Sequence, residues 1–257
     1  MSTTPNAQPK LHAYLAKIGY GSRREIESWI LAKRIQVNGV LATIGQRINP
    51  AKDTIQVDGK PVTTATDTTE HVYFLIDKPR NLVTTTDDEL GRRTVLSLLP
   101  RQNHRIYPVG RLDQDSEGLL LLTNDGDLAY KLTHPKFTIH KTYEVLLDRP
   151  ISYQALQFLR KGVKLKDGFS KPDSVEKMDL EPEKQWLEIT IHEGKNHHIR
   201  RMIERSGYDV KRLIRTKLGP FTLDDLDGET WKQLSAEQVH ELVQTAGNAA
   251  SSLRARY

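Results

Sequence analysis

Apolar residues near the N-terminus recur every three to four positions, which is the period of an amphipathic helix. They form two stripes, separated at Gly19, that predict two short helices. The second helix should begin at Ser22, because Ser22 and Glu25 form a capping box. The apolar members of the two stripes are Leu11, Leu15, Ile18, Ile26, Trp29 and Ile30.

After these helices the pattern changes to the alternation of short strands. "RIQVNGVLAT" contains Asn38-Gly39 and "TIQVDGKPV" contains Asp58-Gly59. Both dipeptides favour a two-residue hairpin turn, because each residue in such a turn needs a positive φ. We therefore expect two helices followed by a small sheet of hairpins.

A threonine-rich stretch, "TTATDTTE", follows at residues 63–70 and has no apolar anchor, as is typical of a linker. The sequence thus predicts a small domain at 1–62 and a larger one at 71–245. The tail, residues 246–257, is expected to be disordered.

The larger domain begins with an apolar strand at 72–76 and continues with strands and helices that alternate irregularly. Two segments, "KTYEVLL" and "WLEITIHEG", show the period-two pattern of strands with one buried face. Because regular βαβ spacing is absent, the sequence favours an α+β fold over a doubly wound sheet. The alternating residues are Tyr143, Val145, Leu147, Leu187, Ile189 and Ile191.

Three further elements are predicted near the C-terminus. A helix opens within "NHHIRRMIERSG", and "RLIRTKLGPFTL" is expected to form one strand. The last helix should span Ser235 to Gln244, with Ser235 and Gln238 as its capping box.

The net charge of +5 is concentrated in one part of the chain. Residues 1–62 hold nine basic and four acidic side chains, an excess equal to that of the whole protein. A basic N-terminal domain favours a polyanion such as nucleic acid as its partner, with an ordinary solvated basic face as the alternative. The side chains near the ends of the second helix, and so available to phosphates, are Arg23, Arg24, Lys33 and Arg34.

The composition excludes several classes of protein. Without cysteine, the chain has no disulfide, thiolate zinc site or cysteine nucleophile. No apolar run reaches the length of a membrane span, and "MSTTPNAQPK" lacks the apolar core of a signal peptide. We therefore expect a soluble, cytoplasmic protein, and no metal site, because no residues show metal-ligand spacing.

The stretch "GRLDQDSEGLLLLTNDGDL" (110–128) is a candidate for chemistry. Asp113 follows an arginine and precedes a run of four leucines, which places its carboxylate at the mouth of a core. Taken alone, Asp113 or Asp115 could also cap a turn. Paired carboxylates could equally indicate a glycosidase or a metal site.

This stretch resembles the catalytic motif of the pseudouridine synthases, in particular the ribosomal RNA family in which an alpha-L, or S4-like, RNA-binding module precedes the catalytic domain. "GSRREIESWILAKRIQVNGVLA" is similar to that module. Three further motifs follow in the family's order: "YFLIDKPRNLVTT", "KTYEVLL" and "EGKNHHIRRMIERSGYDVKRLIRTKLGPFTL". Asn81 departs from the family, which often has glycine there, but asparagine tolerates the left-handed backbone of such a turn.

The resemblance implies a mixed, largely antiparallel catalytic sheet and the isomerisation of a uridine in ribosomal RNA to pseudouridine. No cofactor is implied. Asp113 would be the catalytic carboxylate. Arg200, with Arg201 as its rival in register, would pair with Asp113 and keep it ionised.

The same resemblance implies the walls of the pocket. Tyr143 would stack on the uracil and could assist proton transfer. Leu213 would form an apolar wall, and Arg111 would fill the space left by the flipped base.

A basic band along residues 195–217 would track phosphates beside the site. Lys195 and Arg201 belong to this band, while Arg23, Arg24, Lys33 and Arg34 would recognise folded RNA at a distance. We expect the partner to be ribosomal RNA or a pre-ribosomal particle, bound by a monomer.

The motifs look closest to the branch of the family that acts on large-subunit RNA. The alternatives are a small-subunit enzyme and a catalytically silent RNA-binding or ribosome-assembly factor on the same scaffold. A carboxylate glycosidase is a further alternative, but neutral sugars would gain nothing from the basic domain.

Overall fold

The computed structural model describes residues 8–63, 70–134, 136–179 and 185–254, and only the backbone of 246–254. The chain divides into two compact units between His71 and Val72. The predicted linker at 63–70 lies almost entirely outside the described residues. No helix in the described ranges is both long and apolar enough to cross a membrane.

The first unit has the predicted helices and hairpins. Its capping box at Ser22 and Glu25 is present, and both hairpin dipeptides have positive φ, as for Asn38 at 53° and Asp58 at 51°. Its antiparallel sheet has the strand order β2-β1-β3-β4. The elements are α1 (Leu11–Lys17), α2 (Arg23–Leu31), β1 (Ile35–Val37), β2 (Val40–Leu41), β3 (Ile55–Val57) and β4 (Lys60–Pro61).

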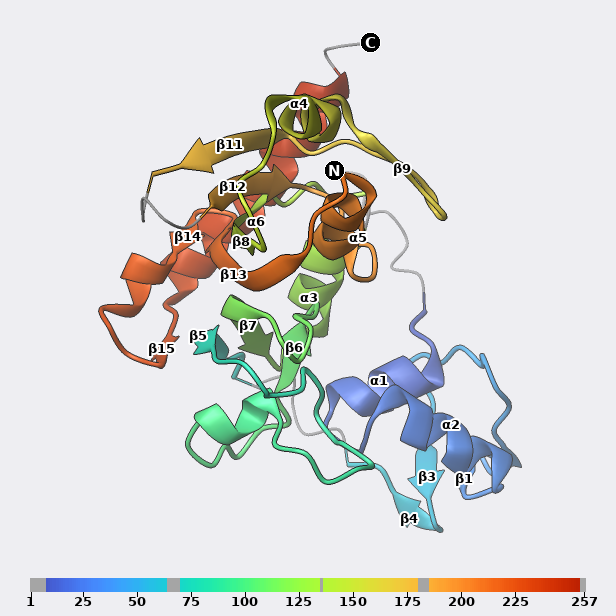
Figure 1. The fold of residues 1–257 in the computed structure, drawn as a ribbon. Coiled ribbons are helices and arrows are strands. Elements are labelled where there is room, and N and C mark those ends of the chain that lie inside the picture. The colour runs from blue at the N-terminus through green and yellow to red at the C-terminus, as the bar shows by residue number, and fades with distance from the viewer. Residues whose placement is uncertain (1–7, 64–69, 135, 180–184, 255–257) are drawn as a thin grey trace. The chain divides into compact units, whose positions relative to one another are not determined.

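The second unit is built on a nine-stranded mixed sheet (Figure 1). The path of the sheet is β11-β12-β8-β13-β7-β5-β15, with β14 paired to β13 and β6 to β7. Among the described strands, only β7 and β13 pair in parallel. The α+β class and the largely antiparallel sheet are therefore confirmed.

The strands of this unit are β5 (Tyr73–Lys78), β6 (Tyr107–Val109), β7 (Glu117–Thr123), β8 (Lys141–Leu147), β9 (Val163–Leu165), β10 (Gly168–Ser170), β11 (Ser174–Met178), β12 (Trp186–Ile191), β13 (Val210–Leu218), β14 (Phe221–Thr222) and β15 (Trp231–Gln233). The helices are η1 (Val95–Leu98), α3 (Gly126–Thr133), α4 (Tyr153–Lys161), α5 (His198–Arg205), η2 (Leu223–Leu226) and α6 (Ala236–Arg254). β9 and β10 form a separate two-stranded sheet.

The four leucines of β7 are fully buried because the strand is covered on both faces. Leu120 and Leu122 belong to a core that includes residues of α4 and α5. Leu119 and Leu121 belong to a second core, with residues of α3 and α6. The leucine run is therefore the centre of a sheet between two helical layers, and the loop before it lies where this sheet ends.

Two boundaries in the structure differ from those expected. The segment 212–223 forms two strands, because the chain turns at Gly219, with φ 59°, and Pro220. The last helix begins with the predicted capping box of Ser235 and Gln238 but continues to Arg254, so most of the predicted disordered tail is helical. Residues 246–254 contain three alanines and no proline, so no residue in this stretch forces the helix to stop at Gln244. Residues 255–257 lie outside the described part.

Gly118 allows the parallel strands β7 and β13 to approach each other. Its φ is +100°, and a Cβ at this position would lie 2.7 Å from the backbone nitrogen of Arg215 and closer still to its carbonyl oxygen. Real side chains do not tolerate such contacts, so any other residue would force the two strands apart.

We predict that Gly118→Ala lowers the free energy of unfolding by about 2–4 kcal/mol, through backbone strain and overpacking combined. Gly207→Ala is the control, because Gly207 also has a positive φ but a Cβ there would meet nothing within 4 Å. Urea unfolding followed by circular dichroism measures both. Equal losses in the two variants would contradict the close approach as the cause.

Candidate active site

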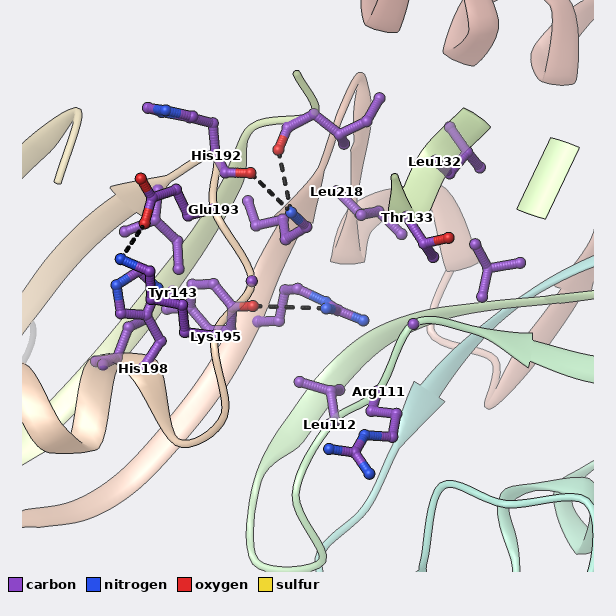
Figure 2. Close-up of a pocket in the computed structure, with 18 of the residues that line it drawn as sticks. Arg111, Leu112, Leu132, Thr133, Tyr143, His192, Glu193, Lys195, His198 and Leu218 are labelled. Carbon is purple, nitrogen blue, oxygen red and sulfur yellow. Dashed lines mark hydrogen bonds and ion pairs between the residues drawn. The ribbon is translucent and has the colours of Figure 1, made fainter. Parts of the chain in front are cut away.

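A cavity of about 640 Å³ opens in the second unit. Four residues predicted from three motifs line it: Arg111, Asp113, Tyr143 and Leu213. Figure 2 shows Arg111 and Leu112 on one side of this space and Tyr143 and His198 on the other. The structure therefore brings together residues that lie up to about a hundred positions apart in the chain.

A buried lysine, Lys78, fixes the loop that carries Asp113 through hydrogen bonds to the backbone. Lys78, at the end of β5, is fully inaccessible to solvent. Its Nζ donates to the carbonyl groups of Pro79 at 3.2 Å, Gln114 at 3.3 Å and Ser116 at 2.7 Å. Burial lowers the pKa of Lys78 to about 8. This role was not predicted from the sequence, although a lysine that ends an apolar strand is a visible signal.

The turn after β5 fixes the same loop through further backbone contacts. The amide of Asn81 donates to the Gln114 carbonyl at 2.8 Å, and the Thr84 hydroxyl donates to the Leu112 carbonyl at 2.6 Å. Asn81 has a φ of 69°, so its predicted left-handed conformation is confirmed. The backbone on both sides of Asp113 is thereby held in place.

The side chain of Asp113 is 28% exposed and faces the cavity. Among the described residues, the basic side chain beside it is the imidazole of His197, whose Nε2 lies 3.8 Å from the Asp113 Oδ1. His197 precedes α5 in a left-handed conformation with φ 47°. This unusual backbone turns the imidazole towards the loop, a position that the sequence alone did not indicate.

Arg200 does not pair with Asp113 in this structure, contrary to the expectation from the resemblance. Its Nη2 lies 2.8 Å from the Asp115 Oδ2 and 3.4 Å from the Ser116 hydroxyl. Arg200 therefore holds the loop two residues beyond Asp113. Arg201, the rival in register, makes two hydrogen bonds to Asp167, at 3.0 and 2.9 Å, and so points towards the β9–β10 turn.

Arg215 is a cavity residue that the sequence pattern placed only in the basic band. It lies opposite Tyr143 in the β13–β8 ladder and is 3% exposed. Its Nε donates to the Leu119 carbonyl at 2.6 Å, and its Nη1 lies 3.5 Å from the Tyr143 hydroxyl. Its Nη2 is buried and has no hydrogen-bond partner among the described residues. The signal in the sequence was an arginine two positions after Leu213, on the inward face of a strand.

Lys141 adds a half-buried cation to the lining. Its Nζ donates to the carbonyl groups of Ile139 and His192, each at 3.3 Å (Figure 2). Burial, and then the neighbouring charge of Arg215, lower the pKa of Lys141 to about 8. The cavity therefore favours ligands that carry acceptor oxygens or negative charge.

The predicted RNA-binding residues have different surroundings. Lys195 lines the cavity, and its Nζ lies 2.9 Å from a carboxylate oxygen of Glu193. In the first unit Arg23, Arg24 and Lys33 are exposed on or just after α2. Arg34 was expected to be available to phosphates. In the structure it instead pairs with Asp58, and its guanidinium lies 5.0 Å from the centre of the Trp29 ring.

No metal centre is indicated in the described ranges, where no three histidine, aspartate or glutamate side chains gather as ligands. His198, next to His197, is instead a buried residue. Its Nε2 contacts the Ser170 hydroxyl, and burial lowers the pKa of His198 to about 4.

Comparison with known proteins identifies the families of both units. The family model described as RNA pseudouridylate synthase matches residues 72–205, and that of the S4 domain matches residues 10–55. A solved structure entitled "Crystal structure of pseudouridylate synthase" superimposes with a TM-score of 0.62 at 26% identity, covering 91% of this chain and 99% of that one.

Two relatives align over nearly their full length. An Aquifex aeolicus protein called an uncharacterized RNA pseudouridine synthase is 36% identical over 240 residues, covering 93% of this chain and 95% of the relative. The Bacillus subtilis ribosomal large subunit pseudouridine synthase B is 36% identical over 236 residues, covering 91% and 95%. Together with the cavity that gathers the expected motifs, these matches show that the chain belongs to the RNA pseudouridylate synthase family and has an S4 domain before its synthase domain.

Proposed function

We propose that the protein converts one uridine of large-subunit ribosomal RNA to pseudouridine, with Asp113 as the catalytic carboxylate and without a cofactor. The observation that carries this proposal is the convergence of Asp113, Tyr143 and Leu213 on one cavity. The relative from Bacillus subtilis is named for the large ribosomal subunit, which supports that choice of RNA.

The proposed reaction is an isomerisation and needs no oxidant or reductant. The bond from ribose C1′ to uracil N1 breaks, the uracil turns within the cavity, and a bond from C1′ to C5 forms. C5 loses its proton and N1 gains one, so the atoms of substrate and product are the same. Asp113 is partly exposed at the cavity, where it can reach the ribose or the ring of a flipped nucleotide.

The cavity walls suit a detached uracil. Tyr143 supplies an aromatic surface that is only 7% exposed, and Leu213 an apolar one. We assign the unpartnered Nη2 of Arg215 to an acceptor oxygen of the base. A donor that is fixed before the substrate arrives stabilises charge on the detached base without reorganisation.

Arg111 and Arg200 have supporting roles in the proposal. Arg111 is on the side of the cavity opposite Tyr143, where it can occupy the space that the flipped base leaves in the RNA (Figure 2). Arg200 positions the Asp113 loop through Asp115 and Ser116. It is therefore a positioning residue in this structure.

We predict that Asp113→Asn lowers pseudouridine formation by at least about 10³-fold and leaves RNA affinity within about twofold, because only the reactive oxygen is replaced. Carbodiimide labelling with primer extension on unmodified large- and small-subunit RNA measures the product. Asp115→Asn is the matched control: it removes the partner of Arg200 and should cause a smaller loss.

Each result of this mapping has a distinct meaning. A single stop in large-subunit RNA that Asp113→Asn removes supports the proposal. A stop in small-subunit RNA would overturn the choice of substrate. Turnover by Asp113→Asn would overturn the catalytic carboxylate, and tight binding without any product would favour a silent RNA-binding factor.

The N-terminal unit should dock RNA through its exposed cations. In the double variant Arg23→Gln with Arg24→Gln, the slope of log affinity against log salt should fall by about 1.4–1.8, because two phosphate contacts are lost. Lys52→Gln with Lys60→Gln removes the same charge from exposed positions outside α2. Filter binding across a salt series distinguishes the pairs, and equal slopes in the two would refute docking through α2.

A further inference from the structure

The β9–β10 hairpin has two different faces, which follow from the alternation of its side chains. Val163, Leu165 and Ser170 are buried, whereas Lys164 and Phe169 are exposed and lie opposite each other in the ladder. The hairpin follows α4 and projects past α5 (Figure 1). The side chains of its outer face therefore do not pack into the hydrophobic core.

The inner face fixes the hairpin to the segment that borders the cavity. The Ser170 hydroxyl contacts His198, and the Lys195 Nζ donates to the Phe169 carbonyl at 3.3 Å. Asp167, in the turn, receives the two hydrogen bonds of Arg201. Because Lys195 and His198 also line the cavity, the hairpin is held directly beside the site.

The ring of Phe169 is exposed but held in position. Its relative exposure is 61%, and it packs on the backbone of Gly162, where a Cβ would lie 2.9 Å from the ring Cε1 and closer to Cζ. Gly162 has a φ of +98°, which favours glycine, and the absence of a Cβ there leaves the space that the Phe169 ring occupies. One exposed phenylalanine is common on protein surfaces, but one that rests on a glycine backbone is a fixed aromatic platform.

The surroundings of this ring are cationic. Lys164, Lys166 and Lys171 are exposed along the two strands and just beyond them, and none of them has an ion-pair partner in the described part of the chain. The carboxylate of the turn, Asp167, is already engaged by Arg201. An aromatic platform among unpaired lysines is the combination by which proteins bind single-stranded nucleic acid.

We propose that the outer face of the β9–β10 hairpin binds unpaired nucleotides of the substrate RNA next to the target uridine. Phe169 stacks on a base, and Lys164, Lys166 and Lys171 contact phosphates. This inference rests on the proposed function, because flipping one uridine leaves its neighbours unstacked and in need of a surface. The loop residues Lys195 and His198 connect the platform to the cavity.

The test compares the affinity of full-length variants for a short oligouridylate and for an RNA duplex of equal length, by fluorescence anisotropy. Phe169→Ala should weaken oligouridylate binding by about five- to tenfold or more and change duplex binding by less than about twofold. Tyr153→Ala is the matched control, because Tyr153 is 71% exposed on α4 of the same unit. Equal affinities of Phe169→Ala and the wild type for oligouridylate would overturn the platform.

Two further variants separate stacking from a change of structure. Phe169→Trp should keep its affinity, and its indole fluorescence should be quenched when oligouridylate binds. The triple variant Lys164→Gln, Lys166→Gln and Lys171→Gln should reduce the salt slope for single strands by about 2. An unquenched indole together with an unchanged slope would overturn the proposal even if Phe169→Ala proved unstable.

The platform and the proposed function fail in different ways. If the wild type forms pseudouridine while Phe169→Ala binds oligouridylate normally, only the platform is refuted. If no ribosomal RNA is modified while Phe169→Ala loses affinity for oligouridylate, the platform stands as a single-strand site and the proposed reaction is refuted.

Discussion

β7 and β13 lie closer together at Gly118 than any residue with a Cβ would permit, and this contact organises the site. It pairs the strand that follows the Asp113 loop with the strand that carries Leu213 and Arg215. β8 lies on the other side of β13 and brings Tyr143 opposite Arg215. The cavity therefore exists where the one parallel pair of the described sheet meets an antiparallel neighbour.

Buried positive charge is the second constraint on this site. Lys78 is surrounded by carbonyl groups and holds the Asp113 loop, whereas Arg215 and the half-buried Lys141 line the cavity. Removing such groups from water is unfavourable, and the carbonyl acceptors offset that cost. Because the loop is fixed through its backbone, the Asp113 carboxylate has no closer side-chain partner in the described part of the chain than His197 at 3.8 Å, and Arg200 engages Asp115 instead.

Local signals in the sequence predicted local structure well. The capping boxes at Ser22 and Ser235 and the two hairpin dipeptides depend on residues within a few positions of one another. The pairing of Arg200 with Asp115 and the burial of Arg215 depend on segments more than eighty residues apart in the chain, so no local pattern could reveal them. The motifs identified Arg111, Asp113, Tyr143 and Leu213 as residues that meet at the cavity, but only the fold adds Lys141 and Arg215 to its lining.

The pairing of Gly118 with Arg215 also has a consequence for folding. The N-terminal unit closes its hairpins across a few residues, so its contacts can form quickly. In the second unit, β7 pairs with β13, about a hundred residues later in the chain. Closing so long a loop costs chain entropy before the strand pairing can stabilise it, so this contact forms slowly. The S4 domain can thus be complete while the cavity of the second unit is still unformed, so a nascent chain would present the exposed Arg23 and Arg24 before Asp113 and Tyr143 had come together.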